Sequence, residues 1–276
     1  MATHDYDTTR RSWNVATRNH NAHKGDQAAA FRAGADPLFP EELELLGDLR
    51  DRSLVHLQCN AGQDSLALAR RGARVTGIDF SDEAIAFAQS LSHDSGIGAS
   101  FEQAEVVSWM QSTERRFDLA FSSYGAVGWL PNLSEWACGI ARILSPSGRF
   151  VYVEFHPVRW SIANDLRLTG DDYFSERPFI EPVSDYVASS GAGLGGIEGA
   201  LPGKNDVPAT GYQYGLAQIV DALLRAGLVL ETLREYPYAN GCRLHEALVA
   251  ASGRRWVWPE GVARTPLMFG LSVRRP

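Results

Sequence analysis

The chain has 276 residues, 45% of them hydrophobic and 21% charged, and its formal net charge is −7. This balance is that of an ordinary globular protein, and the length suits one large domain or one domain with a substantial insertion. An acidic chain without a basic cluster is a poor candidate for binding a phosphate backbone. We therefore expect a small-molecule ligand and no nucleic-acid partner.

No run of eighteen apolar residues is present, so no membrane-spanning segment is predicted. The first residues, MATHDYDTTRRSW, lack the apolar core of a secretion signal, and we expect a cytoplasmic protein. Cys59, Cys138 and Cys242 are too few and too scattered for a disulfide framework or a zinc knuckle. We interpret them as buried free thiols.

Residues 1–50 are predicted to be helical, because FPEELELLGDL places Pro40 at a first helical position and repeats leucine at helical spacing. Short apolar strands then alternate with helices, which predicts βαβ units and a parallel sheet covered on both faces. The predicted strands are 53–57, 73–79, 99–104, 116–124 and 145–155. The predicted helices are 64–72, 81–96 and 133–144, with Ser81 and Gly96 as the caps of the second.

The alternation stops after Phe155. Residues 156 to about 210 carry aromatics, prolines and the glycine-rich SSGAGLGGIEGALPG without clear periodicity, which predicts a functional cover or a partly disordered segment. The alternation resumes with an amphipathic helix predicted at 214–228 and strands predicted at 229–237 and 266–275.

The turn after the first predicted strand, residues 58–64, is the expected ligand site, because ligands of open α/β sheets bind at the carboxyl ends of strands. Gly62 is its only glycine, and Asn60 is the next best residue for a left-handed backbone. Asp79 ends the second strand, where a carboxylate can accept hydrogen bonds from ribose hydroxyls. The turn predicts an adenosine-bearing cofactor without separating NAD from S-adenosylmethionine; neither G-x-G-x-x-G nor a Walker A pattern is present.

Five segments follow one another along the chain: VHLQCNAGQDSLALA, VTGIDFSDEAIAFA, FEQAEVVSW, FDLAFSSYGAVGWLPN and ILSPSGRFVYVEF. This series resembles the motifs of the class I S-adenosylmethionine-dependent methyltransferases. The C-terminal segments are similar to that family's final helix and antiparallel hairpin. The resemblance covers roughly residues 50–156 and 212–275.

The resemblance implies an α/β fold with a doubly wound, mostly parallel seven-stranded sheet and a terminal antiparallel hairpin, the Rossmann-like methyltransferase fold. It also implies N-terminal helices and an insert after the fifth strand. We interpret residues 1–50 as a helical lid, residues 51–156 and 212–276 as the cofactor-binding domain, and residues 157–211 as an inserted substrate cap.

S-adenosylmethionine is the cofactor that the resemblance implies. The sequence departs from the family pattern where His56 replaces the first-motif acid, Gln58 and Asn60 replace glycines and Glu105 replaces an aspartate. The amides of Gln58 and Asn60 can still hydrogen-bond the methionine part of the cofactor. Asp64 and Glu105 have helix capping as the alternative role. The expected cofactor-binding residues are Gln58, Asn60, Gly62, Asp64, Asp79, Phe80, Glu105, Val106 and Ser122.

Two residues are candidates for catalysis. Tyr124 follows the fourth strand, where the resemblance places the transferred methyl group, and a ring face attracts a cation. His156 follows the fifth strand and is suited to removing a proton from a hydroxyl or amine. Plain packing is the alternative for Tyr124, and a surface loop is the alternative for His156.

Substrate contacts are expected from Trp13, His20, Glu154 and Tyr212. An ordinary amphipathic helix is the alternative for the N-terminal pair. His20 and His23 have a spacing that suits a metal, but no acid or cysteine clearly completes a site, so no metal is predicted.

The predicted function is S-adenosylmethionine-dependent methyl transfer to a small organic acceptor, at oxygen or nitrogen rather than carbon, of the kind found in specialised metabolism. Two alternatives stay open. One is a non-catalytic binding protein on the same fold. The other is a nicotinamide-dependent oxidoreductase, which the missing glycines and the terminal hairpin disfavour. The oligomeric state is not predicted.

Overall fold

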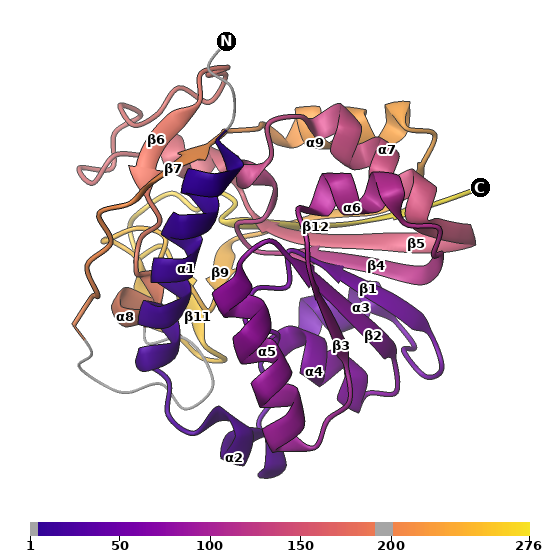
Figure 1. Cartoon of the computed structure of the whole chain (residues 1–276). Helices are drawn as coiled ribbons and strands as arrows, with labels where there is room; N and C mark the ends of the chain where they lie inside the picture. Colours follow the sequence, from indigo (N-terminus) through magenta and orange to yellow (C-terminus); the bar gives the residue numbers. More distant parts are fainter. Residues whose placement is uncertain (1–4, 191–200) are drawn as a thin grey trace.

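The computed structural model describes residues 5–190 and 201–276, and its centre is one seven-stranded sheet with helices on both faces (Figure 1). The strand order is β3-β2-β1-β4-β5-β12-β8. Strands β1 to β5 run parallel, while β12 is antiparallel to both of its neighbours. The predicted doubly wound, mostly parallel seven-stranded sheet is therefore confirmed. The strands are β1 Ser53–Leu57, β2 Arg74–Asp79, β3 Ser100–Gln103, β4 Phe117–Ser123, β5 Leu144–Phe155, β8 Val229–Tyr236 and β12 Met268–Arg274.

Apolar side chains alternate between the two faces of the sheet, so each face buries its own cluster. Helices α6, α7 and α9 cover one face, and α3, α4 and α5 contribute to the cover of the other. The helices of the first face are α6 Val106–Ser112, α7 Leu133–Ile143 and α9 Leu216–Arg225. Those of the second are α3 Pro40–Leu46, α4 Gln63–Arg70 and α5 Asp82–Ser95. The predicted caps of α5 are confirmed: Ser81 accepts the Ala84 N–H, and Gly96 is left-handed.

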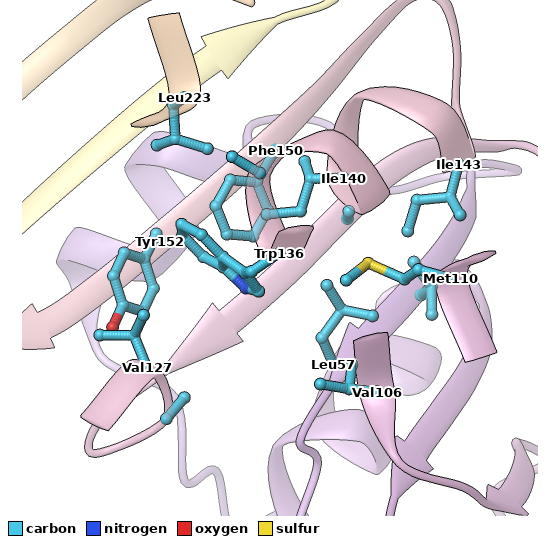
Figure 2. Close-up of a cluster of buried hydrophobic side chains, with 14 of the residues drawn as sticks. Leu57, Val106, Met110, Val127, Trp136, Ile140, Ile143, Phe150, Tyr152 and Leu223 are labelled. Atoms are coloured by element: carbon cyan, nitrogen blue, oxygen red, sulfur yellow. The ribbon is translucent and has the colours of Figure 1, made fainter. Parts of the chain in front are cut away.

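Figure 2 shows the centre of the first cluster, where Trp136 of α7 lies between the rings that β5 contributes. The Trp136 ring centroid is 5.5 Å from that of Phe150 and 5.8 Å from that of Tyr152, both edge-to-face. All three side chains are fully buried. This packing fixes β5, and therefore the position of the residues that follow its carboxyl end.

The terminal antiparallel pair, β8 and β12, is confirmed, but its strands are not joined by a tight turn. Their connection contains a second sheet of order β10-β11-β9. An antiparallel ribbon of β6 and β7 also lies in the insert. Both were missed because strands of three or four residues are too short to show a period of two. These strands are β6 Phe179–Pro182, β7 Pro208–Gly211, β9 Tyr238–Asn240, β10 Val249–Ala251 and β11 Arg255–Val257.

The N-terminal segment forms α1 Tyr6–Ala22 and α2 Gln27–Arg32 before α3. Helix α1 lies across the start of α5, because Arg10 pairs with Asp82 at 2.5 Å and Arg18 pairs with Glu83 at 2.8 Å. The remaining short elements are η1 Val127–Trp129, η2 Pro157–Ser161 and α8 Tyr186–Ser190. The lid and cap interpretations stay predictions, and residues 1–4 and 191–200 of those segments lie outside the described residues.

The three cysteines are free, as expected. Cys59 is buried, whereas Cys138 is exposed on α7 and Cys242 is partly buried. The expectation of a buried thiol is therefore wrong for Cys138, which lies on the solvent side of an amphipathic helix.

Gly62 is the N-cap of α4 and has a φ of +78°. A Cβ at this position would lie 2.6 Å from the Cβ of Ala88 and 2.9 Å from Cε1 of Phe101. Both the left-handed backbone and the close approach of α5 and β3 therefore require a glycine here.

The variant Gly62→Ala is expected to lose about 3 kcal/mol of unfolding free energy, from a left-handed penalty of about 1–2 kcal/mol and a steric cost of about 1–3 kcal/mol. Gly96→Ala is the control, because Gly96 has a φ of +73° but no atom within 4 Å of an added Cβ. That variant should lose only about 1 kcal/mol. Urea unfolding measures both losses, and equal values would contradict the steric argument.

Candidate functional site

A cavity of about 770 Å³ opens at the carboxyl ends of β1, β2, β4 and β5, beside the point where the strand order reverses. Its volume lies within the range of about 300–1,000 Å³ that is typical of small-molecule sites. Side chains from α1, the insert and the β9 end of the second sheet complete its wall. The predicted site residues that line it are Trp13, His20, Gln58, Asn60, Asp64, Asp79, Phe80, Glu105, Val106, Tyr124, Glu154 and Tyr212.

The turn between β1 and α4 keeps a left-handed backbone without the expected glycines. Gln58 has a φ of +54° and Asn60 a φ of +47°, followed by Gly62. A non-glycine residue in this region costs about 1–2 kcal/mol, and such strain is common at functional sites. Gln58 and Asn60 therefore adopt a left-handed conformation that glycine would adopt at lower cost.

Asp79 connects this turn to the start of α5. Its Oδ2 accepts the Asn60 N–H at 2.9 Å, and its Oδ1 accepts the Ser81 N–H at 2.9 Å. Burial raises the pKa of Asp79 to about 6, and these backbone hydrogen bonds oppose that rise. Asp79 lines the cavity, and its carboxylate has lone pairs that these two hydrogen bonds do not use.

His56 stands where the family resemblance places an acid. Its Nδ1 lies 2.8 Å from Oγ of Ser65, and burial lowers its pKa to about 3. The side chain is therefore neutral at physiological pH, and the floor of the cavity lacks a negative charge at this position.

Gln58 and Lys24 present polar groups to the cavity. Gln58 donates from Nε2 to the Ala126 carbonyl at 2.7 Å, and its buried Oε1 has no hydrogen-bond partner among the described residues. No ion pair or side-chain hydrogen bond of Lys24 is found within residues 5–190 and 201–276, and burial lowers its pKa to about 8. Both residues line the cavity. A buried acceptor without a donor is costly, so the Gln58 Oε1 indicates that a polar ligand completes this part of the cavity.

Glu105 caps α6, because its carboxylate accepts the N–H groups of Val107 at 2.9 Å and Ser108 at 2.7 Å. Helix capping, the alternative role that the sequence analysis gave for Glu105, is therefore observed. Glu105 also lines the cavity, beside Phe80 and Val106. These three side chains form a wall that is apolar except for one carboxylate.

Two further acids, Asp64 at the start of α4 and Glu42 of α3, also line the cavity. Burial raises the pKa of Asp64 to about 6, while Lys24 and Arg254 oppose that rise. Glu42 of α3 is fully buried and accepts hydrogen bonds from the Tyr124 hydroxyl and, at 2.9 Å, from the Phe39 N–H.

Three predicted site residues do not line the cavity. Gly62 faces α5 and β3, and Ser122 is fully buried in the sheet, while its neighbour Ser123 lines the cavity. His156 turns away, because its Nδ1 accepts the Val158 N–H at 3.2 Å and its Nε2 lies 2.9 Å from Oε1 of Glu235. The structure does not bring His156 to a ligand in this cavity.

Glu154 reaches the cavity wall, but its oxygens serve the backbone. Oε1 accepts the Gly125 N–H at 2.6 Å, and Oε2 accepts the Ala126 N–H at 3.0 Å and the Tyr152 hydroxyl at 2.7 Å. Glu154 therefore holds the segment after β4 in place.

The other predicted substrate residues, Trp13, His20 and Tyr212, all line the cavity. The Trp13 ring lies edge-to-face on Trp129, with centroids 5.4 Å apart, and within residues 5–190 and 201–276 its buried Nε1 has no hydrogen-bond partner. His20 Nε2 lies 3.1 Å from the Ser184 carbonyl, and burial lowers the pKa of His20 to about 4.

Sequence reasoning missed Lys24, Glu42 and Asn240. Glu42 was visible as a first-turn acid of a helix, but nothing in its segment showed that it faces a cavity. Lys24 is one of only two lysines in the chain, which was a signal of little weight by itself. Asn240 belongs to β9, in a region whose strands were not predicted.

A family model described as a methyltransferase domain matches residues 55–148, the segment from β1 into the start of β5. This match confirms the resemblance to the class I S-adenosylmethionine-dependent methyltransferases that the sequence motifs predict. The chain is 29% identical to a ubiquinone biosynthesis O-methyltransferase of Alkalilimnicola ehrlichii, over 53% of this chain and 62% of that protein. It is 32% identical to a protein of the same name from a Methylobacterium species, over 53% of this chain and 55% of the other. The matches thus span less than two thirds of these two relatives.

The solved structure of the CcbJ methyltransferase from Streptomyces caelestis superposes with a TM-score of 0.60, at 14% identity, over 98% of this chain and 99% of that one. This likeness shows the methyltransferase fold. Within the described part of the chain, no group of three or more His, Cys, Asp or Glu is arranged to hold a metal ion. Across the same residues, no helix has the length and apolar character needed to cross a bilayer.

The raised pKa of Asp79 predicts a pH dependence of stability. Ionisation is penalised in the folded state above pH 6, and this penalty is relieved as the pH falls from 6 towards 4. The unfolding free energy of the wild type relative to Asp79→Asn is therefore expected to rise by about 1–3 kcal/mol between pH 7 and pH 4.5. Urea unfolding at the two pH values measures this difference.

Asp118→Asn is the matched control, because Ser53 hydrogen bonds lower the pKa of Asp118 at the other end of the sheet. The stability that Asp118 contributes is lost on acidification, so the difference should change with the opposite sign. A pH-independent difference for Asp79 would contradict the burial argument.

Proposed function

We propose that this protein binds S-adenosylmethionine in the cavity and transfers its methyl group to a small organic acceptor. The observation that carries the proposal is the left-handed turn at residues 58–62, joined to Asp79 at the point where the strand order reverses. Both similar proteins named above are called O-methyltransferases, which supports oxygen as the methylated atom. The cytoplasmic location and the absence of a nucleic-acid partner stay predictions from the sequence.

The residues present fit the adenosyl half of this cofactor. Asp79 would accept hydrogen bonds from the ribose hydroxyls, because its carboxylate lines the cavity while held by the backbone. Phe80 and Val106 offer apolar surface for a flat base, and Glu105 lies beside them as an acceptor for an exocyclic amino group. Trp13 and His20 of α1 line the same cavity, and Asn14 of α1 accepts a hydrogen bond from the Ser81 hydroxyl at 2.7 Å, which supports a lid role for the N-terminal segment.

The residues also fit the amino-acid half. The buried Oε1 of Gln58 lacks a donor, and an ammonium group would provide one. Lys24 lines the cavity and interacts electrostatically with Asp64, but the two do not form an ion pair within 4 Å, so a ligand carboxylate could also approach Lys24. A zwitterionic tail would therefore offer its ammonium to Gln58 and its carboxylate to Lys24.

When bound, the cofactor supplies a methyl group activated by a positively charged sulfur. The protein excludes water and holds the acceptor in line, and such alignment can supply effective molarities of about 10⁵ to 10⁸ M. The cavity lining also contains the aromatic side chains of Trp13, Trp129, Phe155 and Trp160. An acceptor with an aromatic or other flat apolar body would fit these rings.

The variant Lys24→Met tests the cofactor assignment. Loss of a charge-assisted contact is expected to weaken S-adenosylhomocysteine binding by about 10- to 100-fold, measured by isothermal titration calorimetry. The unfolding temperature should change little, because the lost attraction between Lys24 and Asp64 is offset by removing a partly buried charge, and Arg254 still faces Asp64. Lys204→Met is the control, since Lys204 is exposed and pairs with Asp206 at 2.8 Å.

Wild-type protein that gives no heat with S-adenosylhomocysteine at high micromolar concentration would refute the proposed function. A fluorescence change on adding NADH, without affinity for the sulfur nucleoside, would favour the oxidoreductase instead. Cofactor binding without turnover on any acceptor would favour the non-catalytic alternative.

A further inference from the structure

A short chain of hydrogen bonds lies in the cavity wall beyond the turn. The Tyr124 hydroxyl donates to Oε1 of Glu42, and Nδ2 of Asn240 donates to the Tyr124 hydroxyl at 3.1 Å. All three residues line the cavity. The Tyr124 oxygen thus donates one hydrogen bond and accepts one, which leaves a lone pair able to accept a proton from a ligand.

The backbone holds Tyr124 in an unusual conformation. Its φ is +39°, in the left-handed region that a bulky residue rarely adopts. The Tyr124 N–H donates to the Val153 carbonyl at 2.9 Å, and its ring lies between Phe39 and Phe155, with centroids 6.4 and 5.3 Å away. Backbone strain of this kind persists where the surrounding structure fixes a functional side chain. The direction of the phenol is therefore set by the fold.

The surroundings of Glu42 control its charge. Burial raises its pKa to about 8, and the charges of Asp64 on α4 and Glu41 on its own helix act in the same direction. The hydrogen bonds from Tyr124 and the Phe39 N–H oppose this rise. Lys24 and Arg254 face Asp64, while Arg255 and Tyr238 engage Glu41. Glu42 is thus a carboxyl group balanced between its two protonation states near physiological pH.

We infer that Glu42 and Tyr124 form the proton-accepting pair of the cavity, and that the acceptor presents a hydroxyl group to Tyr124. This inference rests on the proposed function and deepens it. The acceptor oxygen forms its new bond to the methyl carbon as its O–H bond breaks, and the electron pair of the broken S–C bond stays on sulfur. Tyr124 receives the hydroxyl proton and passes its own proton to the Glu42 carboxylate.

The charges balance in this step. Before transfer, the buried site holds one positive sulfur and one negative carboxylate, and afterwards both are neutral. A positive sulfur in the cavity favours the ionised form of Glu42, because an opposite charge stabilises a buried carboxylate. Binding of the methyl donor therefore lowers the pKa of Glu42 and favours the carboxylate that accepts the proton. Binding of the neutral thioether product has no such effect.

Proton counting by calorimetry tests this inference without an acceptor. Titrations with S-adenosylmethionine and S-adenosylhomocysteine are run at pH 7.5 in phosphate and in Tris, whose ionisation enthalpies differ. The wild type is expected to release about half a proton more per molecule with the sulfonium ligand than with the thioether. Both ligands carry the same amino-acid tail, so contributions from Lys24 and Asp64 largely cancel in this difference.

The excess should decline as the pH rises above 8, since Glu42 is then ionised before ligand binds, and should also decline well below pH 7. In Glu42→Gln, the difference in proton release between the two ligands should fall to the small value that the ligands' own amines contribute. In Tyr124→Phe, loss of a hydrogen bond that lowers the Glu42 pKa should move the excess to higher pH. Tyr238→Phe is the control, because Tyr238 bonds Glu41 at 2.6 Å outside the cavity lining and its loss should leave the excess unchanged.

Equal proton counts for the two ligands in the wild type, or an excess that survives in Glu42→Gln, would overturn this inference and leave the proposed function intact. No binding of either ligand would overturn the proposed function, and the inference with it.

Discussion

The site depends on one carboxylate that joins two separate segments. Asp79 accepts one backbone N–H from the turn after β1 and one from the start of α5. Residues of both segments line the cavity, so the carboxylate that fixes their relative position also lines it. Burial destabilises the ionised form of Asp79, and the two backbone hydrogen bonds offset part of this cost. These hydrogen bonds help to keep a negative charge on Asp79 at a buried position, where burial alone would favour the neutral acid.

The same principle extends along the cavity. Lys24, Glu42 and Asp64 all have pKa values moved towards neutrality by burial, and none lies in a fully compensated pair. A protein selected only for stability would replace such groups by apolar ones. A ligand with a cationic sulfur and a zwitterionic tail supplies the missing charges, which is why the proposed cofactor and the proposed base follow from one electrostatic pattern.

Much of the architecture was predictable because parallel strands buried on both faces leave a strong signal. β4 and β5 appear as continuous apolar runs, and the caps Ser81 and Gly96 mark both ends of α5. Strands β6, β7 and β9 to β11 have three or four residues and left no comparable pattern. Their pairing depends on neighbours distant in the chain, which a local window does not contain.

The sequence by itself determined the alternation of strands and helices, the position of the first turn and the acid at the end of β2, because each is a local pattern. Only the tertiary structure decided which polar side chains share the cavity. Glu42, Tyr124 and Asn240 come from α3, the end of β4 and β9, and their meeting depends on how three distant segments pack. His156 was a reasonable candidate by its place after β5, but side-chain direction is set by local hydrogen bonds, and these turn it towards Glu235.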